Sequence, residues 1–167
     1  LEAFCAKAID CGLQISFSSL RADMLTPPLL QALKKAGAKT VTIAPDAGSE
    51  RLRSVINKGM EEKDILQAVD LLVDGGIPNI KLYFMIGLPT ETMSDVDDIV
   101  SLCKRVKHRF LQASRTRGKI GEIIVTVNSF VPKPFTPFQW VPMEDVRMLK
   151  EKIKRIKEGL KRVANVK

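Results

Sequence analysis

The sequence predicts an α/β fold in which about four parallel strands alternate with outer helices. Four short runs rich in apolar and β-branched residues begin near residues 13, 40, 79 and 122, and each is followed by a helical stretch. Because parallel neighbours are joined by crossover helices, this order favours a parallel sheet with right-handed connections. The pattern fits either an open doubly wound sheet or part of a TIM-like (βα) barrel. In both folds ligands bind at the carboxyl ends of the strands.

The first quarter of the chain contains two predicted helices, each followed by a strand. Residues 1–12 are typical of the end of a helix, and the alternating "LQISFS" of residues 13–18 predicts the first strand. Residues 26–38 predict a helix capped by Thr26, with prolines in its first turn. The β-branched run at residues 39–45 predicts the second strand.

Two helices and a strand are predicted for the middle of the chain. Residues 49–56 indicate a short helix, and residues 61–76 indicate a longer amphipathic helix that ends in two glycines. Residues 79–87 predict the third strand. Because this strand is mostly apolar, we expect it to be buried on both faces.

For the last part of the chain we predict one helix before and one helix after the fourth strand. Residues 94–114 indicate a helix with Ser94 as its cap, and residues 121–131 indicate the fourth strand. A final helix is predicted from Met143 onward. Its apolar residues have the spacing of a single seam and are Leu149, Ile153, Ile156, Leu160 and Val163.

Composition predicts a soluble, cytoplasmic domain with a substantial core. The chain has 167 residues, of which 45% are hydrophobic. We find no apolar run of membrane-spanning length and no signal peptide, so no membrane partner is expected. The three cysteines are scattered and only one histidine is present. We therefore expect reduced thiols and no metal site within these residues.

The net charge of +8 is concentrated in two stretches. Residues 99–121 and residues 147–167 each carry a formal charge of +7. Basic stretches of this kind bind phosphate backbones in some proteins, but more commonly they are solvated helix faces. Nucleic acid is therefore a possible partner, and the solvated-face interpretation is favoured.

Each predicted strand is followed by polar side chains or turn-forming residues at its carboxyl end. They include Ser19 and Arg21; Asp46, Ser49 and Arg51; Gly87; and Asn128, Ser129, Lys133 and Trp140. Helix caps and turns explain any one of these loops. They do not explain Arg21, Arg51 and Arg53, because arginine forks are suited to carboxylates and phosphates. Together the loops predict a site for a ligand with carboxylate, amine and ribose groups.

The exit of the fourth strand, residues 130–142, combines four prolines with four aromatic residues. Prolines stiffen an extended segment. Two interpretations are equally supported: a loop that plugs the barrel or covers an edge, and a lid or aromatic wall that faces a substrate.

Four motifs carry a family resemblance. In this order and with similar spacing, "SFSSLRAD", "APDAGSERLRSVINKG", "KLYFMIGLPTET" and "SFVPKPFTPFQW" resemble the second half of radical S-adenosylmethionine (SAM) enzymes. The likeness is greatest to the branch that often carries an upstream cobalamin-binding-like domain, and it extends more distantly to the methylthiotransferases. The resemblance implies a six-stranded partial (βα) barrel, of which the present strands are the third to the sixth.

The resemblance also implies cofactors and roles. In the family a CxxxCxxC loop holds a [4Fe-4S] cluster, and reductive cleavage of SAM gives a 5′-deoxyadenosyl radical. By this likeness Asp46 and Ser49 bind the ribose or amine, and Arg51 and Arg21 are candidates for the methionine carboxylate. Ser19 is also assigned to SAM binding. The likeness also places Met85, Ile86 and Gly87 along the adenine. It places Glu91 in the turn that follows. Asn128, Ser129, Lys133 and Trp140 are the substrate-side candidates.

Two departures from the family pattern matter. Asp46 stands where close relatives usually carry glutamate, and the 167 residues contain no CxxxCxxC motif. We therefore predict that residues 1–167 are the C-terminal portion of a truncated barrel, binding neither cluster nor SAM well and inactive alone. The parent protein is expected to be an iron–sulfur oxidoreductase or transferase.

Two rival functions and one structural consequence follow. The rivals are a basic RNA-binding module without catalysis and a different βα enzyme acting on a phosphorylated substrate. Half a barrel has open sheet edges, which invite pairing. We therefore expect the upstream half of the barrel as a partner in the parent protein. In the chain alone we expect a dimer, a swapped arrangement or an edge covered by a terminal helix.

Overall fold

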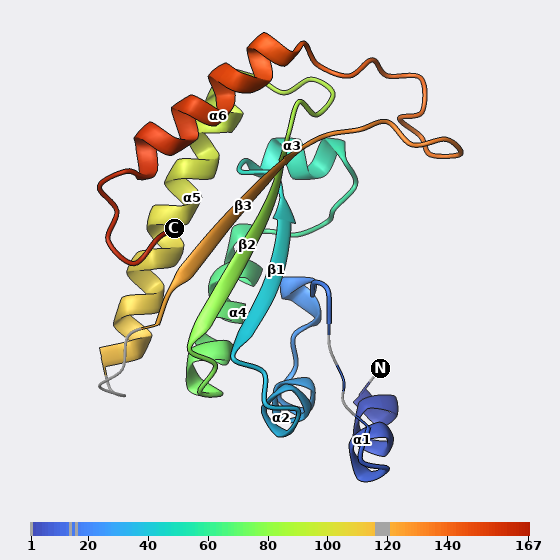
Figure 1. The fold of residues 1–167 in the computed structure, drawn as a ribbon, viewed down its shortest axis with the longest axis vertical. Helices are drawn as coiled ribbons and strands as arrows, with labels where there is room; N and C mark the ends of the chain where they lie inside the picture. Colours follow the sequence, from blue (N-terminus) through green and yellow to red (C-terminus); the bar gives the residue numbers. More distant parts are fainter. Residues whose placement is uncertain (1, 14, 16, 116–120) are drawn as a thin grey trace.

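The computed structural model describes residues 2–13, 15, 17–115 and 121–167. Within these residues three parallel strands form one open sheet in the order β1–β2–β3. The strands are β1 (Thr40–Asp46), β2 (Asn79–Ile86) and β3 (Ile123–Ser129). Helices flank the sheet (Figure 1). The predicted α/β class is confirmed, and the arrangement is consistent with a partial TIM-like barrel.

The described helices follow the predicted order along the chain. They are α1 (Glu2–Asp10), α2 (Pro27–Lys35), α3 (Glu50–Val55), α4 (Glu62–Asp74), α5 (Met93–Ser114) and α6 (Val146–Leu160), with a short 3₁₀ turn, η1, at Ala22–Met24. Thr26 caps α2 as predicted, because its hydroxyl accepts a hydrogen bond of 3.3 Å from the Leu29 amide. None of these helices has the length and apolar character required to cross a bilayer.

The first predicted strand does not form in the described part of residues 13–18. Residues 14 and 16 lie outside the described residues, and their described neighbours are not in a strand. The sheet gains only an isolated parallel bridge between Leu20 and Ile43. The Leu20 amide donates to the Thr42 carbonyl at 2.8 Å, and η1 then turns the chain away two residues later. The described sheet therefore has three strands where the sequence predicted four.

The cap of α5 is Thr92, so the prediction of Ser94 was wrong. Thr92 and Asp95 form a capping box in which each side chain accepts a hydrogen bond from the other's backbone amide. The sequence allows either cap, because an aspartate follows both Thr92 and Ser94 at the third position. Asp95 also bonds to Ser49 and Arg51 on α3. These tertiary contacts favour the earlier helix start.

One face of the sheet is buried and the other is open. On β2 the residues facing the helix layer are fully buried, and they are Ile80, Leu82, Phe84 and Ile86. Lys81, Tyr83 and Met85 alternate with them and are only half-buried. The expectation of burial on both faces was therefore wrong for β2. The helices cover one side of the sheet, and no described element covers the other (Figure 1).

Helix α6 packs against α5 along part of the predicted seam. Leu149 and Ile156 are buried, whereas Ile153 is 37% exposed. Beyond α6 the chain returns to the edge of β3, where the Val125 amide donates to the Lys167 carbonyl at 2.7 Å. A short C-terminal segment thus covers the first part of the β3 edge. The predicted dimer or swapped arrangement stays a prediction.

Candidate functional site

A cleft of about 450 Å³ lies where the three strands end. Its polar lining comes from every strand or from the loop that follows it, and includes Asp46, Lys58, Tyr83, Asn128, Ser129 and Lys133. Its apolar lining includes Met85, Leu88, Phe130 and Phe138. Five of the residues singled out from the sequence, namely Asp46, Met85, Asn128, Ser129 and Lys133, therefore line one cavity. Its size and mixed lining are typical of small-molecule sites.

Asp46 is directed into the cleft by an irregularity at the end of β1. The pairing of β1 with β2 shifts between Ile43 and Asp46, and Asp46 itself has a left-handed φ of 65°. A bulge of this kind redirects a side chain and is common beside active sites. The Asp46 carboxylate accepts a hydrogen bond of 2.5 Å from Lys58 Nζ, and both side chains are largely buried. The strand end therefore presents an ion pair to the cleft.

Ser49 and Arg51 meet at Asp95 rather than in the cleft. Ser49 caps α3 by accepting from the Leu52 amide, and its hydroxyl donates to Asp95 at 2.5 Å. Arg51 donates to the other oxygen of Asp95, also at 2.5 Å, and to the carbonyl of Thr90. Burial alone would raise the pKa of Asp95, but these hydrogen bonds outweigh burial and hold that pKa well below its usual range. This network ties α3 to the start of α5.

The other two arginines also have protein partners. Arg21 is exposed, forks onto Asp23 and donates to the Lys58 carbonyl at 2.8 Å. Through this bond Arg21 lies beside the Asp46–Lys58 pair. Ser19 is exposed as well. Arg53 is 1% exposed and donates to backbone carbonyls of the loops around it. The sequence grouped Arg53 with anion-binding side chains, but its contacts are those of a buried structural residue.

The residues at the end of β2 and in the turn that follows divide between the cleft and the helix layer. Met85 lines the cleft, whereas the Ile86 side chain is fully buried on the opposite face. Gly87 has a left-handed φ of 76°, and its amide donates to the Glu91 carboxylate at 2.9 Å. Glu91 also contacts Lys152 of α6. Of Met85, Ile86, Gly87 and Glu91, the residues predicted here from the sequence, Met85 is the one that lines the cleft, together with Leu88 of the turn.

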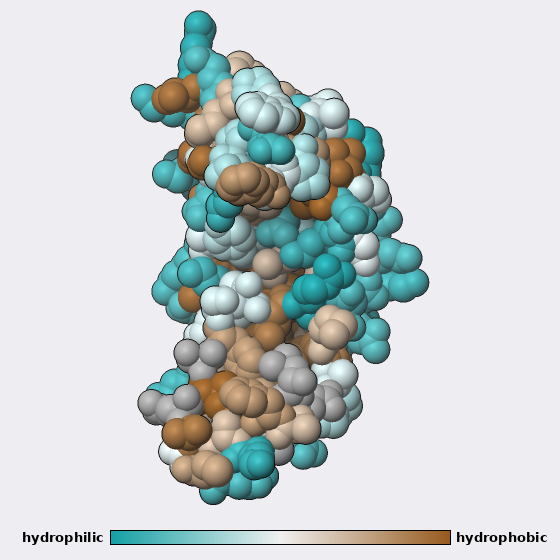
Figure 2. Space-filling view, turned by 90° about the vertical axis from the view of Figure 1, so that its right-hand side faces the viewer, coloured by the Kyte–Doolittle hydropathy of each residue, from teal (hydrophilic) through white to brown (hydrophobic). Residues whose placement is uncertain are grey.

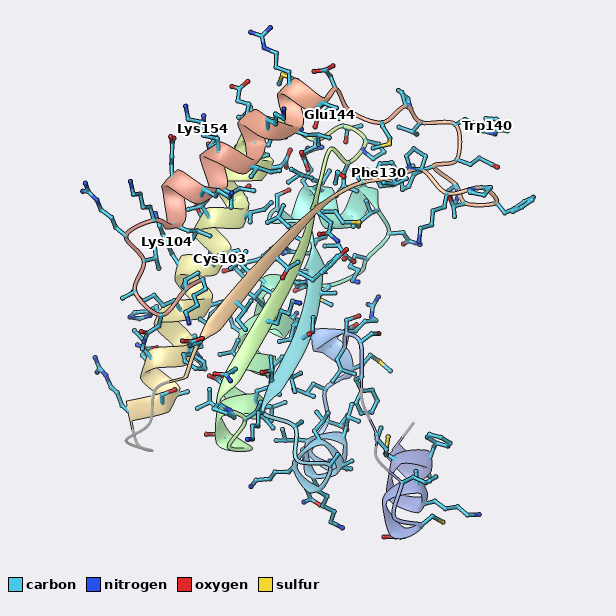
Figure 3. The ribbon with its side chains drawn as sticks, viewed as in Figure 1. Cys103, Lys104, Phe130, Trp140, Glu144 and Lys154 are labelled. Carbon is cyan, nitrogen blue, oxygen red and sulfur yellow. The ribbon has the colours of Figure 1, made fainter. Side chains whose placement is uncertain are left out.

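The exit of β3 places one aromatic pair at the cleft and leaves Trp140 away from it. Phe130 and Phe138 line the cleft and pack edge to face, with ring centroids 6.2 Å apart. Asn128 Nδ2 donates to the Tyr83 hydroxyl at 2.6 Å. Trp140 is 88% exposed and lies at the far end of the projecting loop (Figure 3). The segment therefore forms one wall of the cleft, and Trp140 does not line it.

The cysteines of the chain lie apart from one another. Cys5 and Cys103 are buried and Cys11 is exposed. In the part of the chain that the structure describes, no three His, Cys, Asp or Glu side chains gather in a group that could hold a metal. The residues that the structure describes therefore do not provide a ligand set for an iron–sulfur cluster.

Several cationic side chains of α5 and α6, the helices of the two basic stretches, form ion pairs. Arg105, Arg109 and Arg155 pair with Glu62, Asp70 and Asp97, all at 2.5 Å. Lys152 is buried. These contacts favour the interpretation of the stretches as helix faces, and RNA binding stays a prediction.

Sequence reasoning missed Lys58, Tyr83 and Lys152. Lys58 is twelve residues from Asp46, and nothing local indicates their pairing. Tyr83 sits in an apolar run, although its alternation with buried neighbours was a usable signal. Lys152 belongs to a helix rich in lysine, so it resembled its solvated neighbours.

Comparison with known proteins identifies the family. A family model described as the radical SAM superfamily matches residues 2–103. The chain belongs to the radical SAM superfamily. An uncharacterized protein of Methanocaldococcus jannaschii is 44% identical to it over 153 residues, which are 92% of this chain. The chain spans 31% of the length of that relative. In this radical SAM protein β3 and α6 lie beyond the residues that the family model matches.

Proposed function

We propose that the cleft at the strand ends is the SAM-facing wall of a radical SAM iron–sulfur enzyme. The observation that carries the proposal is the convergence of Asp46, Met85 and Asn128, from three different strands, on one cavity. Family membership supports it. When SAM is bound to a reduced [4Fe-4S] cluster, it supplies a 5′-deoxyadenosyl radical, and the reaction made with that radical is an oxidation or a group transfer.

The residues of the cleft fit the nucleoside part of SAM. The Asp46 carboxylate is an acceptor for ribose hydroxyls or for the amine, and Lys58 holds it in place. Met85, Leu88 and the Phe130 ring provide an apolar surface for adenine. The methionine carboxylate would bind to Arg21, which lies beside the Asp46–Lys58 pair, or to Arg51. Arg51 would then have to bind this carboxylate in addition to Asp95.

Asn128, Ser129 and Lys133 form the substrate side of the same cleft. Their side chains are exposed toward its opening. We assign them to substrate binding, and we assign Trp140 to the rim, where a large substrate or another part of the protein would meet it.

The cluster ligands in this proposal come from outside residues 1–167. These residues contain no CxxxCxxC motif, and those that the structure describes include no metal-binding group. The chain alone is therefore proposed to be inactive, and the full activity belongs to a longer cytoplasmic protein. The length of the M. jannaschii relative supports this, because 153 matched residues make up only 31% of it.

Further barrel strands are proposed to pack beside β1. Among the described residues that edge pairs with Leu20 through a single bridge, and a hollow of about 410 Å³ lies next to it. Phe4, Leu13 and Met24, from the N-terminal part of the chain, are each at least 61% exposed. Figure 2 shows apolar residues gathered on the lower half of this side of the molecule. Apolar surface of this kind is typical of an interface.

The test uses a full-length protein that contains these residues, reconstituted anaerobically with iron and sulfide. We expect it to bind a [4Fe-4S] cluster and to form 5′-deoxyadenosine from SAM on reduction. Asp46→Asn should weaken SAM binding about tenfold or more, because a hydrogen bond to a charged group contributes about 1.5–3 kcal/mol. The matched control is Asp70→Asn, whose carboxylate pairs with Arg109 on the helix layer. An intact wild-type protein that neither binds the cluster nor cleaves SAM would contradict the proposal. So would equal SAM affinity in the two variants.

A further inference from the structure

A lysine is buried where α6 meets the end of β2. The Lys152 side chain is 2% exposed, and its Nζ donates to Glu91 at 2.6 Å and to Glu144 at 2.7 Å. The Glu91 side chain is 1% exposed. Lysine is rarely buried unless it is paired, because removal of the ammonium group from water is costly. The two carboxylates at this position therefore need a cation between them, which an apolar residue on the α6 seam would not provide.

The same carboxylate oxygen holds the backbone at the end of β2. Glu91 Oε1 accepts from the Gly87 amide at 2.9 Å as well as from Lys152. Gly87 has a φ of 76°, a conformation that residues other than glycine rarely adopt. A chain of hydrogen bonds therefore runs from α6 through Glu91 to a backbone amide at the strand end.

Helix α6 also contacts this turn directly. A side chain at position 87 would lie 3.0 Å from Leu149 Cδ2 and 3.2 Å from Glu144 Cβ. Leu149 lies in the first turn of α6, and Glu144 lies two residues before that helix begins. Met85 and Leu88, on either side of this turn, both line the cleft. The position of α6 therefore influences where Met85 and Leu88 lie in the wall of the cleft.

Loss of the ammonium group would leave two carboxylates together in a buried site. Glu91 and Glu144 share Lys152 as their cation, and the second oxygen of Glu144 is buried without a hydrogen-bond partner. Two carboxylates that both lie within 2.7 Å of one ammonium group do not both stay ionised in a buried site once that cation is removed. One of the two would then take up a proton or turn away, and Glu91 in either case loses the cation that holds it against the Gly87 amide.

We propose that Lys152 is a positioning residue for the cleft: it holds Glu91 against the Gly87 amide and so fixes the wall formed by Met85 and Leu88. This inference rests on the proposed function for the identity of the ligand, SAM. It concerns a residue outside the part of the chain that the family model matches, which ends at Cys103. Lys152 touches neither the cleft nor the ligand.

The experiment compares four forms of the full-length, reconstituted protein. Lys152→Met removes the charge at similar volume, and Lys152→Arg retains it. Lys154→Met is the matched control, because Lys154 lies on the same helix, is 75% exposed and has a partner 3.9 Å away (Figure 3). Lys152→Gln, which keeps a donor for Glu91, replaces Lys152→Met if the latter does not fold. Hydrogen–deuterium exchange of the peptide spanning residues 84–91 and the Kd for SAM are measured for each.

In Lys152→Met we expect exchange at residues 84–91 to accelerate at least about tenfold, and the Kd for SAM to rise about tenfold to hundredfold. Lys152→Arg should restore most of both, and Lys154→Met should change neither. Unchanged exchange in this peptide overturns the inference, as does faster exchange with an unchanged Kd. If the wild type binds no SAM, the proposed function fails. The ligand claim then fails with it, and the exchange data still decide whether Lys152 holds the turn.

Discussion

Substitution of Arg53 by Met should destabilise the fold more than any surface arginine can. Arg53 donates to the carbonyls of Met60 at 2.8 Å, Gly48 at 2.9 Å and Ala47 at 3.1 Å. Burial lowers the pKa of its guanidinium from the usual value, which indicates how far the group is removed from water. Methionine keeps the apolar stem but provides no donor, so three buried carbonyls lose their partner.

The magnitude follows from these contacts. A hydrogen bond to a charged group contributes about 1.5–3 kcal/mol, and a buried carbonyl left without its donor costs about 1–3 kcal/mol. Methionine recovers part of this loss, because the guanidinium no longer has to be desolvated. We therefore expect a decrease of about 4 kcal/mol in the free energy of unfolding. That is a large share of the roughly 5–15 kcal/mol typical of a domain.

Urea unfolding followed by circular dichroism measures this change, with the m-value as a check that the transition stays two-state. Arg105→Met is the control, because Arg105 is 46% exposed and pairs with Glu62. An exposed pair contributes about 0–1 kcal/mol. A loss in Arg53→Met no greater than that in Arg105→Met would refute the assignment of Arg53 as a buried structural residue.

Two further predictions concern ionisation. The pKa of Asp95 is lower in the folded protein than in the unfolded chain. Its contribution to stability is therefore complete above the unfolded value of about 3.9 and is lost as the pH falls below it. Asp95→Asn should be less stable than wild type at pH 7, and its unfolding free energy should fall less between pH 5 and pH 2.5. Parallel pH profiles would contradict this. Burial raises the pKa of Cys103 to about 12, so iodoacetamide at pH 8 should alkylate exposed Cys11 at least about a hundredfold faster. Comparable rates by peptide mass spectrometry would show that the core opens at Cys103.

Much of the fold was predictable because its signals are local. Thr26 before two prolines specifies the start of α2, and the β-branched run from Thr40 specifies β1. The first strand was not predictable to the same degree. A strand needs a neighbour along its whole length, and the described residues between 13 and 20 form a single bridge.

The candidate site was predictable in its location and only partly in its contacts. Parallel strands bring their carboxyl ends to one edge, so Asp46, Met85 and Asn128 were expected to meet, and they line one cleft. Residue type alone could not separate the arginines. Arg53 is buried against carbonyls and Arg51 is bound to Asp95, whereas Arg21 is exposed beside the cleft.

The sequence by itself determined the alternation of strands and helices, the family, and the end of the sheet at which the candidate site lies. These depend on periodicity, on caps and on motif order, all of which are encoded in short stretches of chain. Only the tertiary structure decided which charges are partners. Lys58 with Asp46, Arg51 with Asp95 and Lys152 with Glu91 are pairs joined across 12, 44 and 61 residues. The physical reason is that an ion pair depends on distance and burial in space, and neither is written in the local sequence around a charged residue.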